Sequence, residues 1–439
     1  FANNHTKVIN MTYSETVNYL FSLLPAYHRV GKPAYKGNLD NTLRLDSFFG
    51  HPHRQFRTVH VAGTNGKGSV SHMTASVLQE AGYRTGLYTS PHLKDFRERI
   101  RIDGAMIEEE EVIRFVEEHD GLIRDVRPSF FELTVAMAFD YFARKEVEVA
   151  VIEVGMGGRL DSTNIITPEL SVITNIGHDH MEFLGETLAA VAGEKAGIIK
   201  KGVPVIIGET QKETQGVFRQ RAGEMDAPVV FADCRFRCRL GRLWKDRMTR
   251  RYTLTGLADG ISMKGETPLG GAVQRKNIQT VAAVTEALSS GFGLTREHLL
   301  RGVAAVVTNT GLIGRWQVLS RSPLTVCDTG HNREGLEYVV RQLKAADRDK
   351  LHIVLGFVND KDLGSVLPLF PRDALYYFTK ASVPRALDEQ LLKAEAGRHG
   401  LAGEAYSTVS EAVQAARAAA GKRDMIFIGG STFVVADVL

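Results

Sequence analysis

Short apolar runs alternate with helical periods along most of the chain. Residues 57–62 (RTVHVA) form one such run, and the apolar positions that follow between 70 and 81 fall on one helical face. Four more apolar runs lie at residues 85–90, 147–155, 170–177 and 203–208. Because strands in parallel sheets are buried on both faces, near-continuous apolar strands separated by helices predict a parallel α/β sheet.

The alternation of apolar runs and helical segments stops after residue 228 and resumes near residue 323. Residues 234–257 alternate basic with other residues, which predicts a small antiparallel subdomain, and helices are expected at 276–290 and 295–306. The restarted pattern predicts a strand and turn at 324–332, a helix at 333–346, and strands at 351–357, 374–379 and 424–430. We therefore expect an α/β fold of two domains, residues 11–308 and 323–439, joined by an interdomain linker at 309–322.

Composition narrows the class of protein without naming a function. The 439 residues exceed what one core usually serves, and a formal charge of +3 gives no global reason to expect nucleic acid or a membrane as partner. Three cysteines argue against a disulfide-stapled secreted protein. No apolar run approaches a membrane span, and residues 1–10 lack the apolar stretch of a signal peptide. We expect a cytoplasmic protein that starts at Met11.

The stretch HVAGTNGKGSVSHM, residues 60–73, carries the first candidate chemistry. A strand, a glycine-rich turn and a helix amino terminus together form an anion site, where free backbone N–H groups and the helix dipole face the ligand. Lys67 adds a positive charge for the outer phosphates. The strict Walker spacing is not met, because Val61 stands where that pattern has glycine and Gly68 separates Lys67 from Ser69. A nucleoside triphosphate site is one interpretation, and a purely structural turn is the other.

Polar residues follow several other predicted strands. Ser90, Glu153 and the segment His178–His180 come directly after apolar runs in the first domain, and Asp328, His331 and Ser431 do so in the second. In parallel sheets ligands bind beyond the carboxyl ends of the strands. We expect the two sets to face each other across an interdomain cleft. Taken singly, each of these residues could equally be a turn, cap or ion-pairing residue.

The motifs GTNGKGS, TSPH, EVGMGGRLDSTN, HDH, GEKAGIIK, GRWQ and DTGHN, in this order, resemble folylpolyglutamate synthase of the Mur ligase superfamily. The resemblance runs from about residue 12 to the end of the chain. It implies a P-loop ATPase domain of Mur ligase type, with a mostly parallel sheet and a small antiparallel subdomain, followed by a Rossmann-like glutamate ligase domain. The SPHL form of the TSPH motif is similar to that of enzymes that are also dihydrofolate synthases.

The resemblance also implies roles for individual residues. It implies phosphate contacts on Thr64, Asn65, Gly66, Lys67, Gly68 and Ser69, and nucleotide contacts on Asn277, Arg315 and Asp328, the last to the ribose. It implies metal ligands at Ser90, Glu153, His180 and a carbamylated Lys195. It implies folate-side contacts at Glu132, Arg159, Asp161, Ser162, Thr163 and Asn164, and glutamate-side contacts at His331 and Ser431. Lys67, His331 and Lys195 are the residues expected to be catalytic.

The implied reaction joins L-glutamate to a folate carboxylate, or to dihydropteroate, with ATP and Mg²⁺. The resemblance also provides for a second ion, which a carbamylated Lys195 would bind. A carboxylate oxygen is a poor leaving group, so the expected route passes through an acyl phosphate that is shielded from water by domain closure. We expect a monomer that needs no nucleic acid and no membrane.

Three alternatives remain open from the residues alone. A ligase acting on a peptidoglycan precursor would share the phosphate loop, as would a regulatory or motor NTPase. Nucleic-acid binding is the third, through the basic residues Arg235, Arg237, Arg239, Arg242, Lys245, Arg247, Arg250 and Arg251. Alternation along a strand places these on one solvated face. Cys234 and Cys238 without nearby partners are a weak zinc signal.

Overall fold

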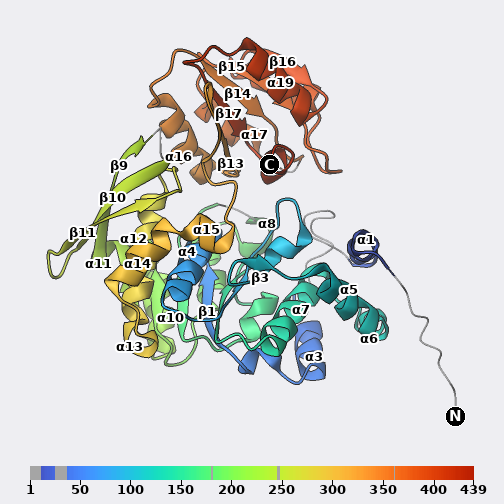
Figure 1. The fold of residues 1–439 in the computed structure, drawn as a ribbon, viewed down its shortest axis with the longest axis vertical. Coiled ribbons are helices and arrows are strands. Elements are labelled where there is room, and N and C mark those ends of the chain that lie inside the picture. Colours follow the sequence, from blue (N-terminus) through green and yellow to red (C-terminus); the bar gives the residue numbers. More distant parts are fainter. Residues whose placement is uncertain (1–10, 25–36, 179–180, 245–247, 360) are drawn as a thin grey trace.

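The computed structural model describes residues 11–24, 37–178, 181–244, 248–359 and 361–439. It shows two α/β bodies stacked along the long axis of the molecule, with the antiparallel subdomain at the side of the first (Figure 1). His180, expected as a metal ligand, and Lys245 and Arg247 of the basic stretch lie outside the described residues.

The first body is built on an eight-stranded sheet of order β4-β3-β2-β5-β1-β6-β7-β8. Its strands are β1 (Arg57–Ala62), β2 (Thr85–Tyr88), β3 (Ile100–Ile102), β4 (Ala105–Met106), β5 (Val149–Glu153), β6 (Leu170–Ile173), β7 (Val205–Ile207) and β8 (Val229–Phe231). All neighbouring strands from β2 to β8 pair in parallel, and β3 and β4 are antiparallel additions at one edge. The predicted, mostly parallel sheet is confirmed.

Helices cover both faces of this sheet, which explains the near-continuous apolar runs. On one face, α4 (Lys67–Glu80), α12 (Gln274–Ala287) and α14 (Arg296–Ala304) share a core with β1, β2 and β5. On the other face, α5 (Glu109–Glu118) and α7 (Phe130–Arg144) form a separate core with β2, β3 and β5. The alternation of side chains along each strand divides them between the two cores.

Shorter helices complete the first body. They are α1 (Tyr13–Leu23), α3 (Asp40–Phe48), α6 (Asp120–Val126), α8 (Met181–Leu184), α9 (Leu188–Ala196), α10 (Gln215–Glu224), α11 (Ala232–Arg235), α13 (Ser289–Phe292) and α15 (Val306–Thr310). Within the described ranges no helix is both long and apolar enough to span a membrane.

The predicted antiparallel subdomain is a three-stranded sheet of order β11-β10-β9. Its strands are β9 (Phe236–Trp244), β10 (Thr249–Gly256) and β11 (Ser262–Thr267). Tyr252 and Leu254 of β10 are buried and join the core that contains α4 and α12. The subdomain is therefore packed onto the first body through one face.

The second body is a six-stranded sheet of order β12-β13-β17-β14-β15-β16. Its strands are β12 (Gln317–Arg321), β13 (Leu324–Asp328), β14 (Leu351–Leu355), β15 (Leu375–Thr379), β16 (Gly403–Tyr406) and β17 (Met425–Gly429). Its helices are α16 (Arg333–Lys344), α17 (Leu363–Val366), α18 (Glu389–Arg398), α19 (Val409–Ala419) and α20 (Thr432–Ala436).

Two strands of this sheet differ from the sequence prediction. Residues 317–321, part of the range predicted as a linker, form β12 and pair antiparallel with β13. Residues 403–406 form β16 at the opposite edge, although no strand was predicted there. Both are short edge strands with half-exposed side chains, so neither produces the apolar run on which the prediction relied.

Candidate functional site

The phosphate loop joins β1 to α4 and is packed tightly on its outer side. Gly63 and Gly66 have φ values of 145° and 86°, which side-chain-bearing residues rarely adopt. A Cβ added to Gly63 would lie 1.9 Å from Thr174 Oγ1, and one added to Gly66 would lie 2.5 Å from Asn277 Oδ1. Glycine at these two positions therefore lets the loop lie close to β6 and α12. Its backbone amides and the amino end of α4 form an anion-binding turn.

Two lysines share one carbonyl oxygen of this loop. Lys67 Nζ donates to Gly63 O at 3.0 Å and to Thr64 O at 3.2 Å. Lys195 Nζ, from the last turn of α9, donates to the same Gly63 O at 2.9 Å. The Lys195 side chain is only 4% exposed. Two ammonium groups that bind one oxygen repel each other, so a negative group placed between or beside them would stabilise the pair.

Glu153 ends β5 beside these lysines and is buried. Its carboxylate Oε2 accepts the backbone N–H of Ser90 at 3.3 Å, which places the predicted metal ligands Ser90 and Glu153 side by side. Burial raises the pKa of Glu153 to about 7, while Lys67 and the Ser90 N–H oppose that rise. Burial thus outweighs the positive charges of Lys67, Arg315 and Arg99 in setting the pKa of this carboxyl group. The third predicted ligand, His180, is outside the described residues.

The residues of the second body reach the site from two short turns. Asp328 at the end of β13 accepts the N–H groups of Trp316 and Gly330, each at 2.8 Å. Burial raises the pKa of Asp328, and Arg315 opposes that rise. His331 Nδ1 lies 3.1 Å from Thr329 O.

Ser431 is the N-cap of α20, where its Oγ accepts the N–H of Phe433 at 3.1 Å, and its side chain is buried. The residues that the sequence assigned to the second body therefore hold their own turns through backbone hydrogen bonds.

A single cleft of about 1410 Å³, including space open to solvent, brings most of these residues together. Its lining includes Thr64, Asn65, Gly66, Lys67, Gly68, Ser69, Ser90, Glu153, Asn277, Arg315, Asp328 and His331. A Cβ added to Gly68 would lie 3.6 Å from Arg315 Nη2 and 3.8 Å from Glu153 Oε2. Groups from both bodies thus converge on the first turn of α4.

Helix α16 and its N-cap make the contacts that hold the second body against the first. Asn332 Nδ2 donates to Asn65 Oδ1 of the phosphate loop at 3.0 Å. Glu334 Oε1 accepts the backbone N–H of His178 at 2.9 Å. Gln342 accepts the N–H of Ala272 at 2.7 Å and donates to Gly270 O at 3.0 Å. The cleft is therefore closed along one side by direct hydrogen bonds between the bodies.

The side chains of the RLDSTN segment, residues 159–164, bond to backbone groups of their own turn and of the neighbouring turn. Asp161 accepts the N–H of Met156 at 2.9 Å and the N–H of Thr163 at 3.0 Å. Asn164 Nδ2 donates to Arg159 O at 3.0 Å. Asp161, Ser162, Thr163 and Asn164 are all buried, and the Arg159 side chain pairs with Glu194.

This segment fixes the turn at residues 155–157. That turn lines a small pocket of about 290 Å³, including space open to solvent, together with Lys67 and Lys195.

Glu132, the other expected folate-side residue, lies in the first turn of α7. Its carboxylate accepts the backbone N–H of Ser129 in a capping box, and Asn41 Nδ2 donates to it at 3.3 Å. The Glu132 side chain is 3% exposed. In this structure it therefore stabilises a helix end and is not among the described residues that line the cleft.

Sequence reasoning missed several polar residues that line the cleft, among them His72, Arg101 and Gln274. Gln274 accepts a hydrogen bond from Asn277 at 2.9 Å and donates to Ser69 Oγ at 3.4 Å, so it joins α12 to the phosphate-loop helix. Its position three residues before Asn277 on one helix was a usable signal. His72 and Arg101 lie within apolar elements, where nothing local marks them as site residues.

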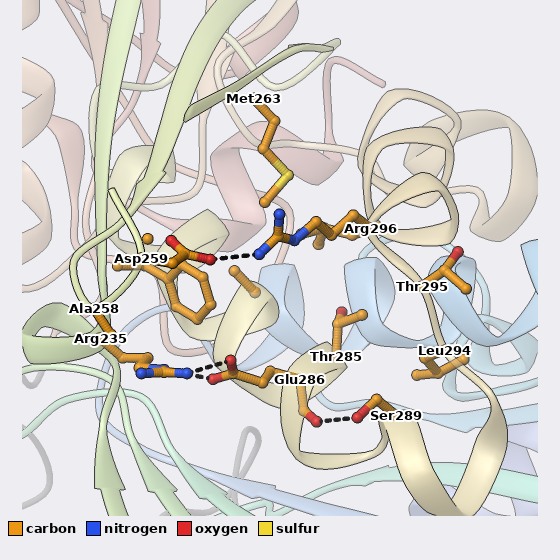
Figure 2. A pocket seen from close by; sticks show the side chains of 14 residues that line it. Arg235, Ala258, Asp259, Met263, Thr285, Glu286, Ser289, Leu294, Thr295 and Arg296 are labelled. Carbon is orange, nitrogen blue, oxygen red and sulfur yellow. Dashed lines mark hydrogen bonds and ion pairs between the residues drawn. The ribbon is translucent and has the colours of Figure 1, made fainter. Parts of the chain in front are cut away.

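The basic stretch contributes to a separate cavity of about 610 Å³ between the antiparallel sheet and α12–α14 (Figure 2). Arg235 forms a two-pronged ion pair with Glu286, and Arg296 pairs with Asp259 across the cavity. Arg251 pairs with Glu266 on the neighbouring strand. These arginines are already balanced by carboxylates.

The three cysteines are free thiols. Cys234 is exposed, whereas Cys238 and Cys327 are buried. Among the described residues no group of three or more histidine, cysteine or carboxylate side chains could hold a metal ion.

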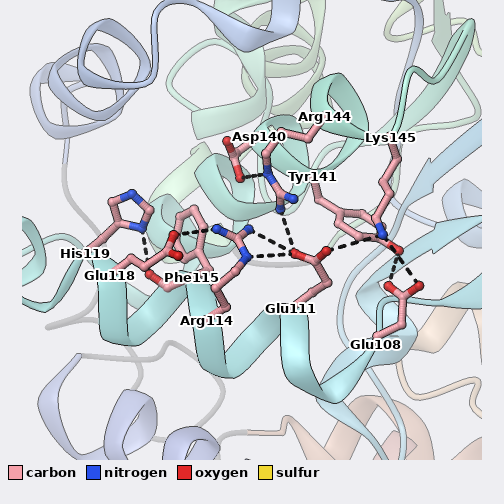
Figure 3. A network of polar contacts seen from close by, with 10 residues as sticks. All are labelled: Glu108, Glu111, Arg114, Phe115, Glu118, His119, Asp140, Tyr141, Arg144 and Lys145. Carbon is pink, nitrogen blue, oxygen red and sulfur yellow. Dashed lines mark hydrogen bonds and ion pairs between the residues drawn. The ribbon is translucent and has the colours of Figure 1, made fainter. Parts of the chain in front are cut away.

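A polar network on the outer face of the first body joins α5 to α7 (Figure 3). Glu111 accepts from Arg114 and Arg144, each at 2.9 Å, and Lys145 lies 3.3 Å away. These side chains are partly exposed, so each pair contributes little to stability. The network orients two helices, and none of its residues named here is among those that line the cleft.

Comparison with known proteins places this geometry in a family. The Mur ligase middle domain matches residues 61–285, and the Mur ligase glutamate ligase domain matches residues 314–432. The folylpolyglutamate synthase of Lacticaseibacillus casei is 33% identical over 86% of this chain and 88% of its own length. The chain belongs to the folylpolyglutamate synthases of the Mur ligase family. This confirms the resemblance that the sequence motifs indicated.

Other Mur ligases of this group extend the comparison. The probable bifunctional folylpolyglutamate synthase/dihydropteroate synthase of Haloferax volcanii is 34% identical over 97% of this chain, which spans half the length of that relative. The solved folylpolyglutamate synthase of Thermotoga maritima is 31% identical, with a TM-score of 0.80 over 97% of this chain and 95% of that one. A solved bifunctional folylpolyglutamate synthase/dihydrofolate synthase holding Mn, AMPPNP and L-glutamate is 26% identical, with a TM-score of 0.81 over 98% and 97%.

Proposed function

We propose that this chain is an ATP-dependent ligase that adds L-glutamate to the carboxylate of a folate-type acceptor and releases ADP and phosphate. The observation that carries the proposal is the cleft in which Lys67, Ser90 and Glu153 of the first body face Arg315 and Asp328 of the second. Relatives named folylpolyglutamate synthase, and a solved relative holding a nucleotide analogue with L-glutamate, support it.

The reaction proceeds in two steps. An acceptor carboxylate oxygen attacks the γ-phosphorus of ATP, ADP leaves, and an acyl phosphate forms. The glutamate amine then attacks the acyl carbon, loses a proton, and displaces phosphate, which carries away the acceptor oxygen. Lys67 and the phosphate-loop amides hold the transferring group and stabilise its charge. The hydrogen bonds from α16 hold the second body in place over the intermediate, which limits attack by water.

The residues present fit a divalent metal ion. Glu153 and Ser90 offer adjacent oxygen ligands, and burial raises the pKa of Glu153, so a cation bound to its carboxylate would offset the cost of burying that charge. We propose that Ser90, Glu153 and His180 hold Mg²⁺. When bound, the ion supplies positive charge that offsets the charge of the triphosphate.

Lys195 is proposed to be carbamylated and to serve a second ion. Carbamylation requires a neutral amine, which attacks carbon dioxide and releases a proton. Lys67 and Lys195 both donate to Gly63 O, so as ammonium groups they repel each other. The product is an anionic oxygen ligand beside Lys67, so the repulsion between the lysines becomes an attraction.

The substrates are assigned to the two sides of the cleft. We propose that His331 and Ser431 act near the incoming glutamate. We propose that Glu132, Arg159 and the segment 161–164 act on the folate side. Within this set, Asp161 supports the wall at residues 155–157 through its hydrogen bond from Met156. Dihydropteroate and a reduced folate are both proposed as acceptors.

The chain is proposed to act as a monomer without nucleic acid. Both sides of the cleft come from one chain, so a second copy is not needed to complete the site. Arg235 and Arg251 of the basic stretch are paired with Glu286 and Glu266. The alternatives of a muropeptide ligase and of a regulatory NTPase gain no specific support from the cleft.

The direct test measures ATP-dependent incorporation of radiolabelled L-glutamate with dihydropteroate and with tetrahydrofolate as acceptors. Incorporation with either acceptor supports the ligase, and ATP hydrolysis that is independent of glutamate and acceptor overturns it. Oxygen-18 placed in the acceptor carboxylate should appear in the released phosphate. Label retained only in the acceptor would rule out the acyl phosphate.

A further inference from the structure

A buried arginine, Arg101, lines the cleft beside the connection between the two bodies. It lies on β3, opposite Leu87 of β2, and its side chain is 9% exposed. A Cβ added to Gly311, at the start of the connection, would lie 3.1 Å from Arg101 Nη1. The guanidinium group is therefore packed against the segment that leads into the second body.

The hydrogen bonds that this guanidinium group makes to the described part of the chain use only one of its corners. Arg101 Nη1 donates to Gly104 O at 2.9 Å. Arg101 Nε is buried and has no hydrogen-bond partner among the described residues. A guanidinium group binds a carboxylate best through two parallel N–H groups, and the edge formed by Nε and Nη2 is such a fork. An unmet buried donor of this kind is costly unless a ligand satisfies it.

Charged groups of both signs lie near Arg101. Burial lowers the pKa of Arg101, and Glu98 and Asp95 raise it. Glu98 is committed elsewhere, because its oxygens accept the N–H groups of Leu93 and Lys94 at 2.8 and 2.9 Å. The nearby His72 bonds to Thr310 at 2.8 Å, and burial together with Arg101 and Arg315 lowers its pKa to about 3.

The substrates of the proposed ligase bring several negative groups to this cleft. The triphosphate is served by the loop amides and Lys67, and the adenine base is uncharged. L-glutamate brings two carboxylates that do not react, and a glutamylated folate brings another. A positive group in the same cleft, apart from the phosphate loop, is therefore available for one of these carboxylates.

We propose that Arg101 binds a non-reacting carboxylate of the amino-acid or folate substrate through its Nε–Nη2 edge, and so determines substrate specificity. This proposal rests on the proposed ligase function. It predicts that Arg101 acts on substrate binding and that nucleotide binding does not depend on it.

The test compares Arg101→Met, Arg101→Lys and the control Arg84→Met in steady-state kinetics. Arg84 lies before the amino end of β2, and its Nε donates to a main-chain carbonyl, that of Lys145, at 2.8 Å. Removing a charge-assisted fork should raise one substrate KM about 10- to 100-fold in Arg101→Met. Arg101→Lys keeps the charge but loses the fork, so we expect a smaller rise. Arg84→Met should match the wild type.

Two acceptors identify which carboxylate is bound. Dihydropteroate carries only the reacting carboxylate, whereas tetrahydrofolate also carries a glutamate. A rise in the KM for L-glutamate with both acceptors assigns the carboxylate to the incoming amino acid. A rise in the acceptor KM for tetrahydrofolate but not for dihydropteroate assigns it to the folate tail. Both results support the proposal.

Other results overturn it. An unchanged KM for L-glutamate and for both acceptors, or a rise confined to the KM for ATP, refutes carboxylate binding by Arg101. Thermal unfolding of each variant separates these outcomes from loss of the fold. If Arg101→Met is unfolded, the KM values of Arg101→Lys decide the question. If the wild-type chain incorporates no glutamate at all, the proposed function fails instead of the role of Arg101.

Discussion

The two sheets of this chain place polar residues at the same kind of position but hold them differently. At the first sheet, Glu153 and Lys195 are each 4% exposed and contact the phosphate loop or its neighbours with their charged atoms. At the second sheet, Asp328 is bonded to backbone N–H groups, and His331 contacts a backbone carbonyl. The first body therefore places buried charged groups against the phosphate loop and its neighbours, whereas the polar groups of the second body hold the turns that follow its strands.

This difference has a physical cause. A buried charge without a full partner costs stability, and a ligand of opposite charge recovers that cost on binding. Turns that satisfy their own hydrogen bonds cost little and bind through shape and position. Substitutions in the first body should therefore change the chemical step most, and substitutions in the second should mainly change substrate binding.

The largest effect is expected for Lys67→Ala. Loss of the positive charge beside the transferring phosphate should lower kcat about 10³-fold, with the fold retained. Single-turnover measurement of acyl phosphate formation checks this, and Lys212→Ala, an exposed lysine, is the control. Near-normal turnover of Lys67→Ala would remove this residue from the mechanism.

Lys195→Ala should be the next most severe. Loss of the proposed carbamate should lower kcat about 10²-fold, and a short carboxylic acid added to the assay should restore part of the activity. The exposed Lys201→Ala serves as control. A carbon-13 carbamate signal is expected from the wild type in labelled bicarbonate and should be missing from Lys195→Ala. Absence of the signal in both proteins contradicts carbamylation.

Glu153 should give a measurable pH dependence. Its pKa is raised to about 7 in the folded chain from about 4.5 in the unfolded chain, so its ionisation opposes folding. The stability of the metal-free protein should fall as pH rises from about 4.5 to 7, by about 3 kcal/mol for this group. Urea unfolding at pH 5 and pH 8 should show this loss in the wild type and not in Glu153→Gln. Equal losses in both proteins would show that Glu153 ionises normally.

The smallest effect is expected at the contact between the bodies. Gln342→Ala removes the hydrogen bonds to Gly270 and Ala272, so the KM for ATP should rise about 2- to 10-fold while kcat changes less. Gln414→Ala, which removes an exposed glutamine of α19, should leave both constants unchanged. A large fall in kcat with Gln342→Ala would show that docking controls the chemical step, contrary to the division between the bodies.

Local sequence patterns predicted most of the framework. The apolar runs at β1, β5 and β14 are long and flanked by glycine or polar turns, and the structure has strands at all three. The edge strands β12 and β16 were missed, because pairing with a neighbour stabilises them and their own side chains are half exposed. The segment that contains α5 and α7 was also left without elements, although it supplies a core of its own.

The candidate site was predictable to a similar extent. Glycine spacing and strand ends pointed to Lys67, Ser90 and Glu153, and the structure brings all three to one cleft. Arg101 and Gln274 were missed, because each belongs to a regular strand or helix and only the neighbours of that element turn it toward the cleft. The segment 161–164 shows the converse, since its polar side chains are used to hold their own turn.

The order of residues alone determined where the chain can form strands, where its backbone can approach an anion, and which side chains can carry charge. These are local properties, set by apolar spacing, by glycine and by residue type. Tertiary structure decided how each charge behaves. It buried Glu153 and raised its pKa, placed Lys67 and Lys195 on one oxygen, and left Arg101 Nε without a hydrogen-bond partner in the described ranges. Those outcomes depend on distances between segments far apart in the chain, because burial and charge interactions act through space and not along the backbone.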